Sequence, residues 1–467
     1  MARKGARVFT CSACDAQSPR WLGRCPECGG WNTFVEGEPE RPSRPGERAS
    51  SSAGSAPILR MKDVDATDSP RLLTGLADVD RVLGGGLVPG SVVLLGGEPG
   101  IGKSTLLLQV AARLAARSGQ VLYVSAEESA RQVRLRADRL GAVVDGLHLL
   151  AETSVDRVLE AAADRPWTAL VVDSIQTVAS PDLPSTPGSV SQVRDAAARL
   201  SVHAKTGGTP VILVGHVTKD GTLAGPKTLE HLVDAVLSFE GERFQAHRVL
   251  RALKNRFGPV HELGVFEMTG EGLVEVTNPS ALYLGGRTGG RPGSAILAAV
   301  EGTRPLLLEV QALTVPVKYG TPRRTAIGFD GTRLALLLAV LERHGGLPLS
   351  GHDVFLNIAG GAESEEPAAD LAVLAAVAGS VREAALPPGA VAFGEVGLLG
   401  EVRAVTDATL RLKEAVSLGF TETFLPAGNA AEAAAFPDLA VTPVGSVEEL
   451  LAKTAAPVRP AAGARRP

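Results

Sequence analysis

A glycine-rich segment near residue 100 could bind the phosphates of a nucleotide. Gly97 and Gly102 flank four residues, and Lys103 and Ser104 follow directly. An apolar run precedes the segment and a Leu/Ala-rich stretch follows it, which predicts a strand, a loop and then a helix. In that setting backbone N–H groups and the helix N-terminus bind phosphate, Lys103 reaches the β- and γ-phosphates of ATP, and Ser104 binds Mg²⁺. The residues expected to hold the nucleotide are Gly97, Glu98, Pro99, Gly100, Ile101, Gly102, Lys103, Ser104 and Thr105.

Two further apolar runs each end in a carboxylate. Asp173 closes the run 168–173, and we expect it to complete the Mg²⁺ site. Glu127 and Glu128 follow the run 121–125. We expect Glu127 to polarise the attacking water, with Glu128 as the alternative. A solvated turn is the competing interpretation of any one of these acids, but their order behind a phosphate loop favours catalysis.

All four cysteines lie in the first 28 residues, as two Cys-x-x-Cys pairs formed by Cys11, Cys14, Cys25 and Cys28. Each pair can place both sulfurs on one metal within a tight turn, and four thiolates make a closed tetrahedral zinc site. Because such a site has no open coordination position, its predicted role is structural or docking. Two local disulfides or a redox pair are the alternatives. The clustering indicates one local purpose in a reducing compartment.

The elements that must position these residues separate by composition. Residues 1–35 are predicted to form the zinc finger, and residues 36–66, rich in Pro, Ser, Glu and Gly, a flexible linker. Over 67–280, short β-branched runs alternate with helical stretches, which predicts a mainly parallel α/β sheet. A second folded domain is expected over 285–455, followed by a tail over 456–467. The expected strands of the first domain are 92–95, 121–124, 170–172 and 211–214, and helices of the second are expected near 333–344, 367–381 and 407–418.

Composition limits the class of protein. The chain has 467 residues, is 45% hydrophobic and carries a net charge of −4. It can therefore bury sizeable cores, and no apolar stretch approaches the ~18 residues that cross a bilayer. A secreted, membrane or collagen-like protein is not expected. Because the net charge is slightly negative, any surface that binds nucleic acid must be local.

One such local surface follows the run 211–214. Lys219 and Lys227 lie in a segment with two glycines between them, where they could contact a phosphodiester backbone. A solvated loop with two lysines is the competing interpretation.

Four features together resemble the bacterial RadA/Sms family of recombination and repair ATPases: the four-cysteine finger, the segment Leu-Gly-Gly-Gly-Leu-Val-Pro-Gly over 83–90, Ser-Ala-Glu-Glu-Ser over 125–129, and Lys-Asn-Arg-Phe-Gly over 254–258. The resemblance implies a cytoplasmic, RecA-like, DNA-dependent ATPase that forms hexameric rings and drives branch migration. It implies that Lys254 and Arg256 reach across a subunit boundary to the neighbour's ATP. ATP, Mg²⁺ and Zn²⁺ are the implied cofactors, and single-stranded or branched DNA and the RecA recombinase the implied partners.

The C-terminal domain resembles the α+β proteolytic domain of the Lon protease. Residues 366–370 read Glu-Pro-Ala-Ala-Asp where Lon has Gly-Pro-Ser-Ala-Gly, so Ala368 occupies the place of the nucleophilic serine. The place of the catalytic lysine falls near Thr409, with Lys413 one helical turn further on. A Ser–Lys dyad is therefore excluded. The resemblance implies a ring-forming scaffold that contacts DNA.

Arg323 and Arg324, beside Lys318, are the expected phosphate contacts of that scaffold, and a solvated loop is the alternative. Two rival functions are an ATP-dependent protease, which Ala368 disfavours, and a regulatory RecA-like ATPase that acts on protein partners. The finger and the Lys-Asn-Arg-Phe-Gly motif disfavour the second rival.

Overall fold

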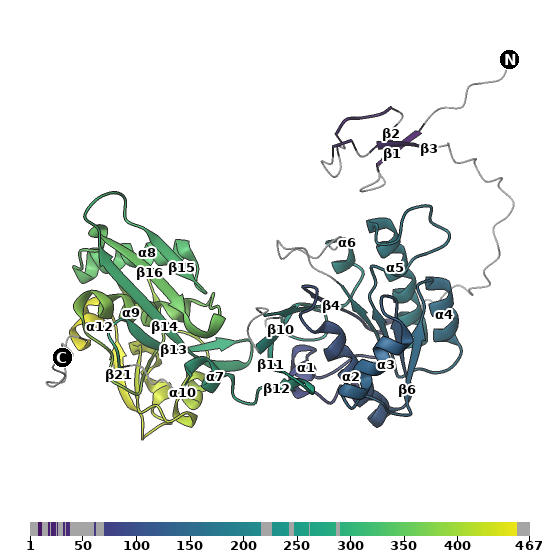
Figure 1. Ribbon diagram of the computed structural model, residues 1–467. Coiled ribbons are helices and arrows are strands. Elements are labelled where there is room, and N and C mark those ends of the chain that lie inside the picture. Colours follow the sequence, from purple (N-terminus) through teal and green to yellow (C-terminus); the bar gives the residue numbers. More distant parts are fainter. Residues whose placement is uncertain are drawn as a thin grey trace, which may run out of the picture. The chain divides into compact units, whose positions relative to one another are not determined.

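The computed structural model describes residues 8–11, 17–18, 20–24, 26, 31–32, 34–37, 60–61, 70–215, 227–241, 247–260, 262–285 and 290–454. The chain divides into two compact units, Met1–Glu275 and Val276–Pro467 (Figure 1). The division precedes the expected domain end at 280, because helix α7 (Pro279–Leu284) packs on strand β14 (Arg304–Pro316) of the second unit. Ser280 Oγ accepts the Leu307 N–H there at 3.0 Å. Within the described residues, no helix has the length and apolar character needed to cross a membrane.

A nine-stranded sheet forms the centre of the first unit. Six neighbouring strands run parallel and three antiparallel strands extend one side. Each of the four apolar runs expected to form a strand lies in the parallel part, so the loops after these strands share one edge of the sheet. In spatial order the strands are β12 (Gly272–Glu275), β11 (Leu263–Thr269), β10 (His247–Asn255), β9 (Ala235–Glu240), β4 (Val92–Gly97), β8 (Val211–Val214), β7 (Ala169–Asp173), β5 (Val121–Ser125) and β6 (Leu147–Ala151).

Alternate strand residues face two different helical layers. In β4, Val93 and Leu95 join one core with α1 (Ala77–Val82), α2 (Lys103–Ser118) and α3 (Ala130–Arg139). Val92 and Leu94 join another core with α4 (Val155–Ala163) and α5 (Val190–Gly207). This is why the parallel strands read as continuous apolar runs instead of alternating with polar residues. Helix α6 spans Lys227–Glu230.

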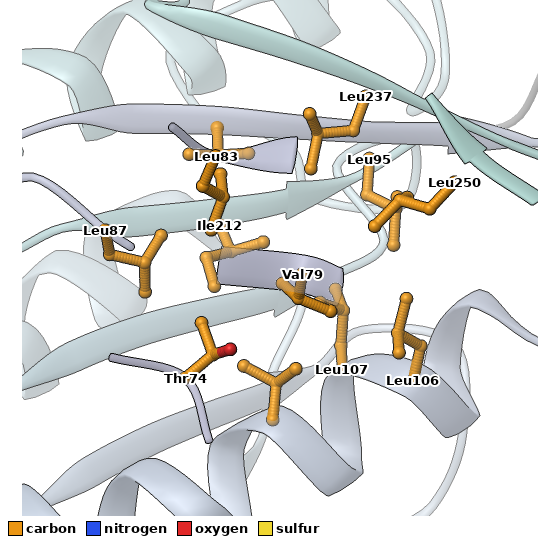
Figure 2. Close-up of a pocket in the computed structure, with 12 residues that line it drawn as sticks. Thr74, Val79, Leu83, Leu87, Leu95, Leu106, Leu107, Ile212, Leu237 and Leu250 are labelled. Atoms are coloured by element: carbon orange, nitrogen blue, oxygen red, sulfur yellow. The ribbon is translucent and has the colours of Figure 1, made fainter. Parts of the chain in front are cut away.

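The first of these cores fixes the strand and the helix that flank the glycine-rich loop. Figure 2 shows Leu95 of β4, Leu106 and Leu107 of α2 and Leu250 of β10 around a small space in this core. Its lining is apolar apart from Thr74, so it is a packing space and not a site for a charged ligand.

The N-terminal segment contains a small antiparallel sheet of three strands in the order β2-β1-β3. Cys11 ends the central strand, is fully buried, and packs with Phe34. The strands are β1 (Val8–Cys11), β2 (Gln17–Ser18) and β3 (Phe34–Gly37).

The second unit is a mixed seven-stranded sheet with helices packed on it, which agrees with an α+β architecture. Helix α9 (Asp370–Arg382) packs on β13 (Ser294–Glu301) and β14, and its first ten residues are buried. Helices α8 (Gly331–Gly345) and α10 (Ala408–Ser417) lie where they were expected. The remaining elements are β15 (Arg324–Ile327), β16 (His352–Ile358), β17 (Ala390–Ala392), β18 (Glu395–Val396), β19 (Val402–Arg403), β20 (Glu422–Pro426), α11 (Ala430–Ala433), β21 (Ala440–Val444) and α12 (Val447–Lys453).

Candidate active site

The glycine-rich loop joins the carboxyl end of β4 to the first residue of α2, Lys103. A Cβ atom at Gly97 would lie 2.5 Å from the Phe239 carbonyl oxygen, and one at Gly102, where φ is +116°, would lie 2.6 Å from Met268 Cε. Both positions therefore require glycine. Beside Gly100, in contrast, a Cβ would meet nothing within 4 Å, so the loop is open to a ligand there.

Lys103 lies inside this loop. Its Nζ donates hydrogen bonds to the Gly97 and Glu98 carbonyl oxygens at 2.8 and 2.9 Å, and the residue is only 4% exposed. Burial lowers the pKa of Lys103 to about 8, and the charges of Asp173, Glu127 and Glu98 oppose this shift. The ammonium group is thus partly desolvated, which strengthens its attraction for a phosphate.

Asp173 ends β7 and is 9% exposed. The Tyr123 hydroxyl, from neighbouring β5, donates to Asp173 Oδ2 at 2.6 Å. Burial, followed by the Asp173 charge, raises the pKa of Tyr123 well above its ordinary value, so the hydroxyl stays protonated and donates. Sequence reasoning missed Tyr123. The only signal in the sequence was a single hydroxyl in an apolar strand. Its partner could not be predicted, because the pairing of β5 with β7 is a feature of the folded sheet.

The structure separates the two candidate glutamates. Ser174 Oγ donates to the Glu127 carboxylate, which places Glu127 beside the residue after Asp173. Glu128 pairs instead with Arg136 of α3, at 2.6 Å. Glu127 is therefore the acid that lies with Lys103 and Asp173, whereas Glu128 is held by a helix.

The donor set fits a nucleotide bound with Mg²⁺. Hydroxyls of Ser104 and Thr105 stand half-buried in the first turn of α2, and the Asp173 carboxylate faces the same edge of the sheet. Hydroxyl and carboxylate oxygens are the ligands that Mg²⁺ takes in such sites, together with phosphate oxygens.

Lys254 and Arg256 lie at the opposite edge of the sheet. Lys254 Nζ donates to the carbonyls of Glu230 and Val233, and burial lowers the pKa of this lysine. Arg256 pairs with Asp234 at 3.1 Å and keeps a half-exposed side chain. Asp234 also accepts the N–H of Val92, the first residue of β4, at 3.0 Å. Because the six residues of β4 span roughly 17 Å, Arg256 is far from the phosphate loop of its own chain.

The motif that contains these two residues forms a corner with the segment 83–90. Arg71 donates to the carbonyl oxygens of Gly84 and Phe257, the second at 2.8 Å. A Cβ at Gly258 would lie 2.8 Å from the Gly84 Cα, so the two backbones touch. Two segments that are far apart in the sequence are thus one structural feature.

Several known proteins are similar to this chain. A family model described as "AAA domain" matches residues 55–222. The DNA repair protein RadA of Bacillus subtilis is 50% identical over 424 residues, which is 90% of this chain and 92% of that protein. RadA of Pseudomonas aeruginosa is 50% identical over 427 residues, covering 91% and 94%.

The chain belongs to the RadA family of DNA repair proteins. The AAA-domain match spans the phosphate loop, Glu127 and Asp173, so the first unit contains the ATPase domain of this family member. Among solved structures, a KaiC-like protein from Pyrococcus horikoshii matches 44% of this chain and 99% of its own, with a TM-score of 0.37 and 23% identity.

The cysteines of this RadA-family chain fall within a second matched model, "Rubredoxin metal binding domain", over residues 9–36. Cys14, Cys25 and Cys28 lie outside the described residues. Within the described part of the chain, no group of three or more potential ligands gathers around one point. Four thiolates in two Cys-x-x-Cys pairs are nevertheless a donor set that suits zinc.

Of the expected nucleic-acid contacts, Lys219 also lies outside the described residues, and Lys227 begins α6. Arg323 is exposed. The Arg324 guanidinium binds three backbone carbonyls, those of Leu349 at 2.8 Å, Arg323 at 3.1 Å and His352. Arg324 therefore holds its own loop together.

The second unit has an ion pair beside the place of a Lon nucleophile. Ala368 is 2% exposed. Arg411, buried on α10, binds both carboxylate oxygens of Glu366 at 2.9 and 2.7 Å and the Ala298 carbonyl at 2.7 Å. Thr409 and Lys413 are exposed on the same helix, so neither is packed inside with Ala368. Sequence reasoning missed Arg411, because only the packing of α10 shows that this side chain points into the core of the unit.

Proposed function

We propose that the protein is a cytoplasmic DNA-dependent ATPase that assembles into a hexameric ring and drives branch migration in RecA-dependent repair. The observation that carries this proposal is the placement of two functional groups at the two ends of β4. The phosphate loop follows its carboxyl end, and Arg256 lies at its amino end. A head-to-tail ring brings one end of each subunit against the other end of its neighbour.

Within one subunit, Lys103 binds the β- and γ-phosphates and Glu127 holds the attacking water. The Ser174 hydroxyl fixes the Glu127 carboxylate for this task. Ser104 and Asp173 would bind Mg²⁺, which neutralises charge on the phosphate oxygens. The water oxygen bonds to the γ-phosphorus as the bond to the β–γ bridging oxygen breaks, which yields ADP and phosphate.

The neighbouring subunit supplies Lys254 and Arg256. Arg256 leaves Asp234 and binds the oxygens of the transferring phosphoryl group, where charge is greatest in the transition state. Its half-exposed side chain supports this role, and so does its distance from the phosphate loop of its own chain.

Basic residues of both units contact single-stranded and branched DNA. We assign phosphate contacts to Lys219 and Lys227 of the first unit and to Lys318 and Arg323 of the second. Arg324 stays a predicted phosphate contact, and its guanidinium also binds three carbonyls that position the loop. The second unit is a ring-forming scaffold without peptidase activity, since Ala368 offers no nucleophile.

The N-terminal finger binds one zinc ion through Cys11, Cys14, Cys25 and Cys28. Purified protein should contain about one zinc per chain, and Cys25→Ser should lose it. Metal-free protein with two disulfides after reducing purification would refute this assignment.

The experiment that tests the proposed function is ATP turnover with and without single-stranded DNA. We expect DNA to stimulate turnover in the wild-type chain and not in Lys103→Ala. A rate that DNA leaves unchanged would favour the regulatory ATPase, whose partners are proteins.

A further inference from the structure

A short loop of the second unit, residues 317–323, joins β14 to β15 and is anchored at both ends on one strand. The Val317 N–H donates to the Gly351 carbonyl at 2.8 Å, next to the start of β16. The Arg323 N–H donates to Asp353 Oδ1 at 2.6 Å, and the Val354 N–H donates to the Arg323 carbonyl at 2.9 Å. Because the anchors lie close together on the same segment, they hold the two ends of the loop together.

Between these anchors the loop carries a solvent-exposed aromatic side chain, Tyr319. Tyr319 is 94% exposed, and no other aromatic residue in the described part of 276–454 is exposed. Gly320 follows with a φ of +94°, and a Cβ there would meet nothing within 4 Å. The ring therefore stands on a turn with open space beside it. Aromatic rings in folded proteins normally bury most of their area, so the exposed Tyr319 ring is available to stack on a ligand.

The charges around the ring define the chemistry of its partner. Lys318 and Arg323 are exposed on either side, and the Arg324 guanidinium adds a third positive charge at the base of the loop. The carboxylate of Asp353 accepts the Arg323 N–H. An aromatic face between cations matches a strand whose bases are unpaired, since bases stack on the ring and phosphates pair with the cations. Duplex DNA presents phosphates but hides the faces of its bases.

We propose that Tyr319 stacks on an unpaired base of single-stranded DNA, with Lys318 and Arg323 on the adjacent phosphates. This inference rests on the proposed function, because it requires that the protein binds DNA. It adds the group that distinguishes single strands from duplexes. The two anchors keep the loop ordered before binding, so little conformational entropy is lost when the base stacks.

The test measures binding of the full-length chain to a fluorescent oligonucleotide, as single strand and as duplex, over a range of salt concentrations. Tyr319→Ala should weaken single-strand binding about 5- to 160-fold, which is the usual range for losing one stacked base. Tyr319→Phe should bind within about twofold of wild type because the ring is kept. Duplex binding should be nearly unchanged in both. Leu399→Ala, at another position that is 81% exposed, is the matched control and should have no effect.

Two further arms separate stacking from charge. Lys318→Ala or Arg323→Ala should weaken single-strand and duplex binding alike. Each should also reduce the number of counterions released on binding, read from the slope of log affinity against log salt concentration, by about one. Tyr319→Ala should leave this slope unchanged. An oligonucleotide with abasic sites should bind wild type and Tyr319→Ala equally.

Wild-type protein that binds no DNA would refute the proposed function itself. Wild-type protein that binds single strands no more tightly than Tyr319→Ala would refute stacking and leave the proposed function standing. A Tyr319→Ala variant that changes mass in light scattering, with equal losses on both DNA forms, would show that Tyr319 contacts another subunit, and would also overturn the inference.

Discussion

The phosphate loop of the first unit and the Ala368 region of the second both bury a cation near a carboxylate, yet they differ in how the cation is held. Lys103 binds two backbone carbonyls of its own loop, with open space beside Gly100. Arg411 binds both oxygens of Glu366, the Ala298 and Thr406 carbonyls, and stacks 5.7 Å from the Phe393 ring centroid.

The difference separates a site that can do chemistry from one that holds a fold. The contacts of Lys103 can be exchanged for phosphate oxygens without leaving a buried charge unpaired. Those of Arg411 cannot be exchanged, because its guanidinium and the Glu366 carboxylate complete each other inside the unit. A buried cation therefore indicates a ligand-binding site only where a ligand can take the place of the groups that now contact the cation.

The largest effect is expected at Lys103, whose contacts a phosphate can replace. Lys103→Ala should weaken ATP binding and reduce turnover by about 10³-fold or more, because both the ground-state contact and transition-state charge stabilisation are lost. Equilibrium binding of a fluorescent ATP analogue and steady-state turnover measure the two effects. Normal turnover in this variant would contradict the view that Lys103 serves catalysis whereas Arg411 serves folding.

The next largest effect is expected at Arg411, whose contacts are all within the second unit. Arg411→Met should destabilise the second unit by about 3 kcal/mol, because Glu366, whose side chain is only 17% exposed, loses its charged partner. The double variant Arg411→Met, Glu366→Leu should lose clearly less than the sum of the single losses. Hydrogen exchange of residues 294–312 and 408–417 in the full chain would report this locally. Equal protection in wild type and Arg411→Met would contradict a structural role.

A smaller effect is expected from the hydroxyl that orients Asp173. Tyr123→Phe should cost about 1–2 kcal/mol of activation free energy, or about 5- to 30-fold in kcat, through loss of one hydrogen bond to a carboxylate. ATP affinity should change little, since Lys103 and the loop are intact. A change in KM without a change in kcat would mean that Tyr123 serves nucleotide binding instead.

The smallest effect is expected at Ala368, the position that the Lon resemblance gives to a nucleophilic serine. Ala368→Ser introduces a hydroxyl without a base, because the exposed Lys413 lies on another face of α10 from the buried Arg411. We expect no peptidase activity on an unfolded protein substrate, with or without ATP. Measurable cleavage by this variant would show that the dyad argument is incomplete.

Sequence patterns predicted the parts of this molecule that depend on local order. The apolar runs became β4, β5, β7 and β8, and the glycines of the phosphate loop stand where a side chain would collide. Contacts that depend on sheet order or helix register could not be read in this way. The pairing of Tyr123 with Asp173, the Arg411–Glu366 ion pair and the tethering of Arg324 each join residues through packing, which no spacing in the chain encodes.

A catalytic site shared between two subunits is tested most directly by mixing two inactive variants, Arg256→Ala and Glu127→Gln, and measuring DNA-stimulated ATP turnover. Neither variant should turn over ATP alone, although Arg256→Ala should still bind it through its own phosphate loop. In an equal mixture with random exchange, about a quarter of the interfaces combine an intact Glu127 with an intact Arg256, so turnover should return in part. If exchange is confirmed, and doping with wild-type subunits shows that one intact interface suffices, a mixture as inactive as its parents would contradict a site completed from the neighbouring subunit.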